Sequence, residues 1–555
     1  MVFFMKFKLI SSLEKCFLDE QIKDKPEYLS ASCFKNEMFH FGLAYCSSSN
    51  LTEYVCLSVE SPLKEYITVR KVANVPVQFA AKPECKNNGY LRTEPGLYPD
   101  FLQPLPKDGR FPVTENLRSL YVEVDTKGEV EAGVYPITLC FTENKPEKTV
   151  HKTTFTLEII NDLLPENDFI YTNWFHCDCL MNYYGVECFS EEHWRIIENF
   201  LKIAVKYGMN MVLTPVFTPP LDTPIRGERP TVQLVDVYYK KGKYSFGFEK
   251  LERWIKLCNN VGIKYFEISH LFTQWGVRCA PKIMAECDDG YKRIFGWENA
   301  SDSIEYTAFL DAFLPELMNF LKSCNNADKR CYFHVSDEPK LRDIEYYKSA
   351  KELVRKHVGD RPIIDALSNY EFFSNGICSN PIPGTNAIEP FLENNVKDLW
   401  CYYCEAQGLD VSNRFIALPS YRNRIIGIQM YKFGIKGFLH WGYNYYYNRY
   451  SYEAINPYLT TDGDMFVPSG DCFTVYPSTN GEALSSIRQA VFYNALQDMR
   501  ALLLYEKYFG KKATVDLIDT QQEITFKNYP HNDDYILNLR QHINNKIKKL
   551  HMGES

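Results

Sequence analysis

The fold is decided between residues 153 and 174, where the spacing of apolar side chains changes. This stretch begins Thr153-Thr154-Phe155-Thr156-Leu157-Glu158-Ile159-Ile160, passes through a polar segment at 161–168, and continues Phe169-Ile170-Tyr171-Thr172-Asn173-Trp174. The first part alternates apolar and polar residues, which is typical of a half-buried antiparallel strand. The last part begins a series of short apolar runs separated by helical stretches, which indicates parallel β/α units. We therefore expect two different architectures to meet here.

On the N-terminal side, residues 5–160 read as short strands broken by Pro, Gly and Asn. Alternation is clearest at 66–72, 119–124 and 133–141. Strands at short and regular spacing are typical of a β-sandwich. We predict this domain over residues 1–162.

On the C-terminal side, eight apolar runs alternate with helical stretches, which fits a (β/α)₈ TIM-type barrel over residues 163–510. The expected strands are 169–174, 211–214, 265–269, 330–335, 362–366, 387–388, 398–403 and 437–441, and the expected helices include 191–207, 248–261, 304–324, 344–357 and 423–433. A helix at 484–505 follows. A small extension, 511–555, is predicted to hold one or two strands at 513–526 and a basic helix at 535–550. The predicted class is multidomain α/β.

Composition narrows the range of partners. A chain of 555 residues is too long for a single hydrophobic core, so we expect more than one domain. The net charge of −8 argues against nucleic acid or an anionic membrane as the main partner. No 18-residue apolar run occurs, and the first ten residues are too short an apolar run for a signal peptide, so we expect a cytoplasmic protein. The 18 cysteines lack zinc-site spacing and are interpreted as reduced and structural; we predict no metal and no cofactor. The sequence does not indicate an oligomeric state.

Two adjacent acids follow the fourth expected strand, in Tyr332-Phe333-His334-Val335-Ser336-Asp337-Glu338-Pro339. Neighbouring carboxylates are costly to ionise together, so their pKa values separate, as a general acid beside an electrostatic stabiliser requires. Catalytic residues of such barrels lie at the C-terminal ends of strands. We therefore interpret Asp337 and Glu338 as catalytic. The alternative is two solvated acids before a helix that begins at a proline.

Six short motifs along the chain carry a family resemblance. They are Thr93-Glu94-Pro95-Gly96-Leu97-Tyr98-Pro99-Asp100, Val335-Ser336-Asp337-Glu338-Pro339, Leu399-Trp400-Cys401-Tyr402-Tyr403-Cys404, Leu439-His440-Trp441-Gly442-Tyr443-Asn444, Gly470-Asp471-Cys472-Phe473-Thr474-Val475-Tyr476-Pro477 and Ser486-Ile487-Arg488. In this order, over about residues 60–510, the chain resembles glycoside hydrolase family 123 and the related domain of unknown function 4091. The resemblance implies a β-N-acetylgalactosaminidase with a β-sandwich before a catalytic barrel. It also implies a retaining mechanism in which the 2-acetamido group of the substrate is the nucleophile.

Carried over by motif, Asp337 would be the ionised carboxylate that orients the acetamido group, and Glu338 would be the acid/base. Side chains that are adjacent on one strand end are poorly placed to flank a sugar from opposite faces, whereas an acetamido nucleophile removes that requirement. We therefore expect a retaining exo-glycosidase that hydrolyses terminal β-linked N-acetylgalactosamine in an oligosaccharide or glycoconjugate. The reaction would pass through an oxazolinium ion.

Residues at other strand ends are candidate substrate contacts, although any one of these aromatic side chains could belong to the core. A Trp and a Tyr could enclose the acetamido group, while Asn and His could bind sugar hydroxyls. The candidates are Asn173 and Trp174 after the first strand, His270 after the third, Tyr402 and Tyr403 at the seventh, and Trp441, Tyr443 and Asn444 after the eighth.

Two alternatives stay open. A glycosidase of the same fold that acts on a sugar without an acetamido group would need a separate nucleophile, for which Asp365 or Glu389 could serve. A non-catalytic carbohydrate-binding protein would keep the barrel without the activity. His334 is interpreted as structural, and Asp365 is also a candidate for orienting a Tyr or Arg.

Overall fold

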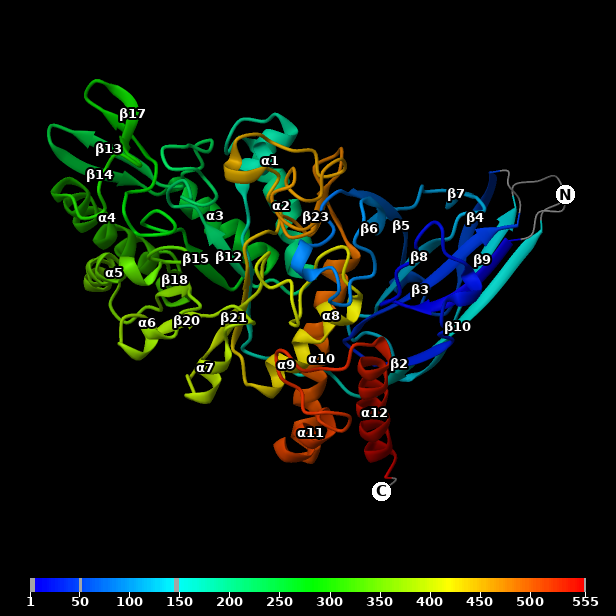
Figure 1. Ribbon diagram of the computed structural model, residues 1–555. Helices are drawn as coiled ribbons and strands as arrows, with labels where there is room; N and C mark the ends of the chain where they lie inside the picture. The colour runs from blue at the N-terminus through cyan, green and yellow to red at the C-terminus, as the bar shows by residue number, and fades with distance from the viewer. Residues whose placement is uncertain (1–4, 49–51, 144–148, 554–555) are drawn as a thin grey trace. The chain divides into compact units, whose positions relative to one another are not determined.

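The computed structural model describes residues 5–48, 52–143 and 149–553, so the first four residues of the N-terminal apolar run lie outside it (Figure 1). The chain forms two compact units. The first unit comprises Met1–Asn167, Leu409–Phe433 and Leu484–Ser555, and the second comprises Asp168–Gly408 and Gly434–Ala483. These units are groupings in space, whereas the expected boundaries at 162 and 510 divide the chain in sequence. Those boundaries stay predictions.

The first unit contains two five-stranded sheets. All strand pairs in them are antiparallel except β2 with β10. One sheet has the order β1 (Met5–Ser11), β3 (Met38–Ser47), β8 (Arg118–Asp125), β5 (Ile67–Val77) and β6 (Gly96–Pro104). The other has the order β2 (Ser30–Phe34), β10 (Val150–Ile160), β9 (Gly133–Glu143), β4 (Glu53–Glu60) and β7 (Arg110–Val113).

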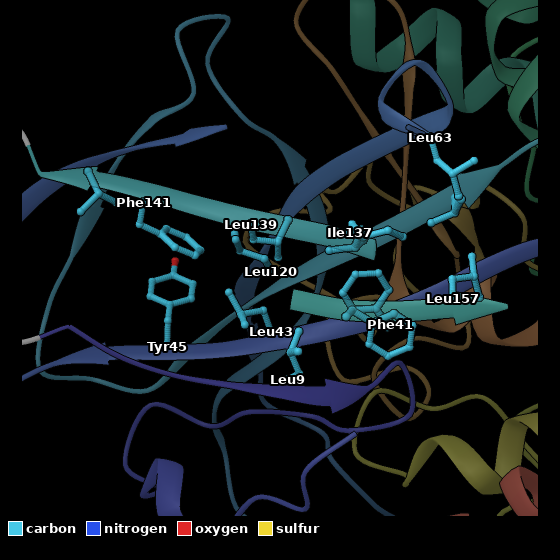
Figure 2. Packing of buried hydrophobic residues seen from close by; sticks show 14 of the residues in the cluster. Leu9, Phe41, Leu43, Tyr45, Leu63, Leu120, Ile137, Leu139, Phe141 and Leu157 are labelled. Carbon is cyan, nitrogen blue, oxygen red and sulfur yellow. The ribbon is translucent and has the colours of Figure 1, made fainter. Parts of the chain in front are cut away.

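Both sheets contribute to one hydrophobic core (Figure 2). Leu43 and Leu120 pair across β3 and β8, while Leu139 comes from the other sheet. Phe41 stacks on Phe155 with ring centroids 4.1 Å apart. Each buried side chain of this size contributes about 1.5–3 kcal/mol of hydrophobic free energy. The alternating apolar residues of these strands therefore meet between the sheets, as a sandwich requires.

The C-terminal part of the first unit is helical. The predicted helix 423–433 is divided into α8 (Ser420–Arg424) and α9 (Ile426–Lys432), and α10 (Ile487–Phe509) and α12 (Asp533–Met552) lie where helices were expected. The strands predicted at 513–526 are wrong, because α11 (Lys511–Ile518) and a loop occupy this segment. Thr514 and Ile518, four residues apart, are the buried residues of α11. The β-branched residues of this segment favour a strand, but the packing of one helical face outweighs that preference.

The second unit is built on a curled parallel sheet. Its six strands have the order β18 (Cys331–Phe333), β15 (Tyr265–Ile268), β12 (Met211–Thr214), β11 (Ile170–Asn173), β22 (Gly437–His440) and β21 (Trp400–Tyr402). A parallel pair, β19 (Ile364–Ala366) and β20 (Asn380–Ile382), is joined to the two edge strands by the isolated bridges Phe333↔Ile363 and Gly384↔Tyr402. Closure into a complete eight-stranded barrel stays a prediction.

The sixth strand was predicted at 387–388, and this position is wrong. The sixth strand is β20, and α7 (Glu389–Glu393) begins directly after residue 388. Pro381 lies inside β20 and pairs with Asp365 at a sheet edge, where a missing N–H is tolerated.

Helices of the second unit follow its strands, and four of them lie where the sequence predicted them. The helices are α1 (Cys177–Tyr184), α2 (Glu191–Lys206), α3 (Glu249–Val261), α4 (Ile304–Ser323), α5 (Ile344–Val358) and α6 (Glu371–Ser374), besides α7. A separate four-stranded sheet has the order β14 (Lys243–Gly247), β13 (Asp236–Lys240), β16 (Ile283–Cys287) and β17 (Gly290–Phe295). Within the described ranges, no helix is both long and apolar enough to cross a membrane.

Candidate active site

A cavity of about 180 Å³ lies at the carboxyl ends of the parallel strands of the second unit. Nine of its lining residues are aromatic or acidic, and each comes from a strand end or from the loop that follows. The lining residues are Trp174, Asp222, Trp275, Asp337, Glu338, Ala366, Tyr402, Cys404, Glu405, Leu439, Trp441, Phe466 and Val467. A larger hollow of about 350 Å³ at α4 and α5 does not include the acid pair.

The adjacent acids both line this cavity because the backbone turns at Glu338. Along an extended strand, successive side chains point to opposite faces. β18 ends at Phe333, and Glu338 has φ +42°, in the left-handed region, so the two acids lie in a bend after the strand. The Trp275 N–H donates to the Asp337 carbonyl over 2.9 Å, and the Tyr402 hydroxyl donates to Glu338 Oε1 over 2.7 Å. Neighbouring loops and strands thus hold both acids in place.

The pKa of Asp337 lies well above its usual range, and burial is the largest cause. The charges of Glu338 and Asp222 raise this pKa further, while the charge of His334 lowers it. The Asp337 carboxyl has no hydrogen-bond partner for its side chain within the described part of the chain. The structure therefore favours a proton on Asp337, whereas the sequence-based hypothesis placed it on Glu338.

A layer of polar side chains lies buried beneath the cavity. Glu267 on β15 accepts hydrogen bonds from the Thr172 hydroxyl (2.5 Å), from Trp174 Nε1 (2.7 Å) and from His334 Nε2 (2.6 Å). Trp174 lines the cavity above. Glu267 therefore connects the wall of the cavity to the interior of the sheet.

His334 lies between two carboxylates in this layer. Its Nδ1 is 3.1 Å from Asp365 Oδ1, and Asp365 also accepts from the Val335 N–H and from the Tyr347 hydroxyl (2.6 Å). Burial lowers the pKa of His334, but the hydrogen bonds and charges of Asp365 and Glu267 outweigh burial and raise it to about 10. His334 is therefore an imidazolium that donates from both ring nitrogens.

His270, His334 and Asp365 lie close enough together to suggest a metal site. Both ring nitrogens of His334 already face carboxylate oxygens, and the His270 ring stacks on it at 4.1 Å. Burial and the charge of His334 hold the pKa of His270 well below its usual value, so His270 is neutral. Both nitrogens of His334 face carboxylate oxygens, so His334 would have to give up a proton and a hydrogen bond to ligate a metal.

Among the predicted substrate contacts, the structure brings Trp174, Tyr402 and Trp441 together with the acid pair. Trp441 is held by its indole N–H, which donates to Asp471 over 2.9 Å. The same carboxyl lies 3.2 Å from Nε2 of His440, whose Nδ1 accepts from the Gly442 N–H. The three aromatic residues therefore form part of the cavity wall.

The other five predicted contacts are buried and do not line the cavity. Tyr443 donates its hydroxyl to the Phe200 carbonyl, and Asn444 bonds to both backbone groups of His176. Tyr403 packs edge-on against Phe438. Asn173 is the last residue of β11, and His270 packs edge-on against Trp174 with ring centroids 5.2 Å apart.

Four acidic or aromatic residues that line the cavity were not predicted from the sequence: Asp222, Trp275, Glu405 and Phe466. All four belong to long irregular segments, in which no apolar period marks an element. A weak signal existed for Asp222, which is a single acid among Pro219, Pro220 and Pro224 after the second strand.

Comparison with known proteins gives a family for this arrangement. Residues 174–505 match the model of the catalytic domain of glycoside hydrolase 123. The search of curated proteins found no match.

Among solved structures, a family 123 glycoside hydrolase from Clostridium perfringens, studied for glycolipid glycan hydrolysis, is 13% identical, and the alignment covers 99% of each chain with a TM-score of 0.74. At this identity the likeness shows the fold alone. A family 39 glycoside hydrolase from Bacteroides cellulosilyticus is 11% identical over 84% of this chain and 81% of its own, with a TM-score of 0.33. A Bacteroides ovatus family 5 xyloglucanase is 8% identical over 85% and 98%, with a TM-score of 0.28. With TM-scores this low, neither of these two structures is evidence for the fold.

Proposed function

Because the chain belongs to glycoside hydrolase family 123, we propose that it is a retaining exo-glycosidase that releases terminal β-linked N-acetylgalactosamine by substrate-assisted catalysis. One observation carries this proposal: the adjacent acids Asp337 and Glu338 line one cavity at the same strand end. Two carboxyl groups that flank a glycosidic bond in an enzyme with a protein nucleophile are about 5–5.5 Å apart across the sugar. Two carboxyl groups that are adjacent in sequence instead favour a mechanism in which the substrate supplies the nucleophile.

In the proposed first step, the Glu338 carboxyl protonates the glycosidic oxygen while the acetamido oxygen of the substrate attacks C1. The C1–O bond breaks, the alcohol leaves, and a cyclic oxazolinium forms. In the second step, the Glu338 carboxylate removes a proton from water, which attacks C1 and reopens the ring with net retention. The Tyr402 hydroxyl, 2.7 Å from Glu338 Oε1, orients the carboxyl in both steps.

Asp337 accepts the acetamido N–H as a carboxylate in this proposal, so the proton that the free site favours on Asp337 passes to Glu338 when the substrate binds. Its burial and its acidic neighbours make the carboxylate form costly in the structure. A positive charge that develops on the oxazolinium removes that cost, because the carboxylate then has an opposite charge beside it. Asp337 would therefore stabilise the charged intermediate more than the neutral substrate, which is what catalysis requires.

The two candidates for a separate protein nucleophile lie outside the lining. Asp365 is fully buried and bonded to His334 and Tyr347, and Glu389 begins α7. This supports the acetamido group as nucleophile. The proposal also includes closure of the eight parallel strands as a (β/α)₈ barrel, which the two isolated bridges support.

Glycoconjugates are the proposed natural substrates. The C. perfringens relative was studied for hydrolysis of glycolipid glycans, and glycolipid glycans are therefore the first natural substrates to test.

Nitrophenyl β-glycosides test the proposal directly. The wild type should cleave the N-acetylgalactosaminide and leave the 2-hydroxy galactoside intact, and a thiazoline mimic of the oxazoline should inhibit it. Asp337→Asn and Glu338→Gln should both lose activity, whereas Asp302→Asn, at an exposed residue outside the cavity, is the control. Cleavage of the galactoside without inhibition by the thiazoline would support a glycosidase with a protein nucleophile.

Sugar binding without hydrolysis of any glycoside would instead support the non-catalytic alternative. Calorimetry with N-acetylgalactosamine separates this outcome from a protein that does not bind sugars.

A further inference from the structure

We propose that Asp222 is the specificity-determining carboxylate of this site: it accepts a hydrogen bond from a hydroxyl group of the bound sugar and repels sugars that carry a sulfate, phosphate or carboxylate group. The inference rests on the proposed function, because it assigns a substrate contact in the same cavity.

Asp222 lines the cavity with an unused carboxylate. The residue is half-buried, and its side chain has no hydrogen-bond or ion-pair partner among residues 5–48, 52–143 and 149–553. A half-buried carboxylate without a donor loses hydration without compensation. A sugar hydroxyl in the cavity supplies the missing donor.

The backbone of Asp222 is fixed although its side chain is free. Its N–H donates to Gln274 Oε1 over 2.7 Å, and its carbonyl accepts from the Ser451 hydroxyl over 2.7 Å. Gln274 Nε2 also donates to the neighbouring Thr223 carbonyl over 3.0 Å. Three bonds therefore hold the loop around Asp222.

The same support reaches the acid pair. Trp275, next to Gln274, donates its N–H to the Asp337 carbonyl over 2.9 Å. The adjacent residues Gln274 and Trp275 therefore hold the backbone of both Asp222 and Asp337. A surface acid with no role in binding would not require this shared support.

Asp222 also has an unfavourable backbone conformation, with φ +50°. Non-glycine residues rarely adopt the left-handed region, and those that do concentrate at ligand-binding sites. Asn and Asp tolerate this region better than other residues. The Asp222→Asn variant should therefore retain the loop.

The charge around Asp222 is negative. Burial raises its pKa to about 6, the charge of Arg229 lowers it, and the charges of Glu338 and Asp471 raise it, so Asp222 is mostly ionised at neutral pH. Arg229 is itself paired with Asp178 through two bonds of 2.8 Å. The lining contains four acidic side chains and, among the residues that the structure describes there, no Lys, Arg or His. An anionic sugar would enter without a counter-charge.

The test compares wild type with Asp222→Asn on 4-nitrophenyl N-acetyl-β-galactosaminide and on its 3-, 4- and 6-deoxy analogues. The variant should lose about 10- to 100-fold in kcat/KM on the parent substrate, since a hydrogen bond to a charged group is lost. In wild type, one deoxy analogue should show a similar loss. That analogue should lose nothing further in the variant, which identifies the hydroxyl.

The 4-O- and 6-O-sulfated substrates test the repulsion. The ratio of kcat/KM for sulfated to parent substrate should rise at least tenfold in Asp222→Asn and stay unchanged in the Asp302→Asn control. Thermal unfolding of both variants should match wild type, which separates a contact from a loss of folding.

Equal kcat/KM of wild type and variant on the parent substrate would overturn the inference, and so would equal losses for every deoxy analogue in both enzymes. A wild type that cleaves no 2-acetamido glycoside would overturn the proposed function instead. The same variant is then compared on the neutral nitrophenyl glycoside that the enzyme cleaves, where equal rates would again overturn the role of Asp222.

Discussion

Two acid-rich layers of the second unit differ in how their carboxylates are used. In the buried layer, Glu267 and Asp365 each accept several hydrogen bonds and share the imidazolium of His334. In the cavity above, the side chains of Asp222 and Asp337 have no such partners among the described residues. Satisfied carboxylates stabilise the fold, whereas unsatisfied carboxylates are available to a ligand. Substitutions in the buried layer should therefore lower mainly the stability, and substitutions in the cavity should lower mainly the activity.

Glu338→Gln should show the largest effect. General acid–base catalysis contributes about 10²- to 10⁴-fold, so kcat on a substrate with a poor leaving group should fall by that range. Stability should change by less than about 0.5 kcal/mol, because the residue is exposed. Steady-state kinetics with a nitrophenyl and an alkyl glycoside measure this. A loss of equal size on both substrates would argue against the acid role.

Glu267→Gln should act on stability. The amide would present a donor to a set of three donors, and removal of one partner from a buried ion pair costs about 3–5 kcal/mol. Urea unfolding measures the difference. Glu252→Gln is the matched control, because Glu252 forms a solvent-exposed pair with Lys256 that is worth about 0–1 kcal/mol. Equal stabilities of the two variants would contradict a structural role for the buried layer.

Alkaline pH should weaken the buried layer. The pKa of His334 in the folded protein is about 10, above its value of about 6.5 in an unfolded chain. Its contribution to stability is therefore complete below pH 6.5 and is lost as pH rises toward 10. Unfolding free energies measured from pH 6 to pH 10 should fall more steeply for wild type than for Glu267→Gln. Parallel curves would show that His334 is not the group responsible.

Tyr402→Phe should have the smallest effect of this series. It removes the 2.7 Å hydrogen bond to Glu338, and activity should fall about tenfold, while the aromatic wall of the cavity is preserved. Comparison of a nitrophenyl with an alkyl glycoside locates the cause, because a misplaced Glu338 acid should slow the alkyl glycoside more. Equal losses on both substrates would instead indicate that Tyr402 contacts the sugar.

Part of this site could be predicted from the sequence because strand ends are local features. An apolar run that ends in two acids and a proline marks Asp337 and Glu338, and Trp174, Tyr402 and Trp441 stand at similar ends. Tyr443 and Asn444 had the same local signal, but their side chains turn to bond with Phe200 and His176 in the interior. Sequence spacing does not specify which partner lies beneath a loop.

Other parts could not be predicted, because they depend on contacts between distant segments. The fully buried partners of His334 lie 67 and 31 residues away, and Asp222 meets Ser451 across 229 residues. The helix at Lys511–Ile518 also followed packing and not its β-branched composition. Periodicity is a property of neighbouring residues, whereas the partners of a carboxylate are a property of the folded chain.

The sequence by itself determined the change from alternating strands to parallel β/α units and the adjacency of the two acids, because side-chain period and residue order are local. Only the tertiary structure decided that His334 is charged, that Asp222 faces the acid pair, and which aromatic residues line the cavity. These properties depend on burial and on charges that loops bring together, and both arise only when the chain folds.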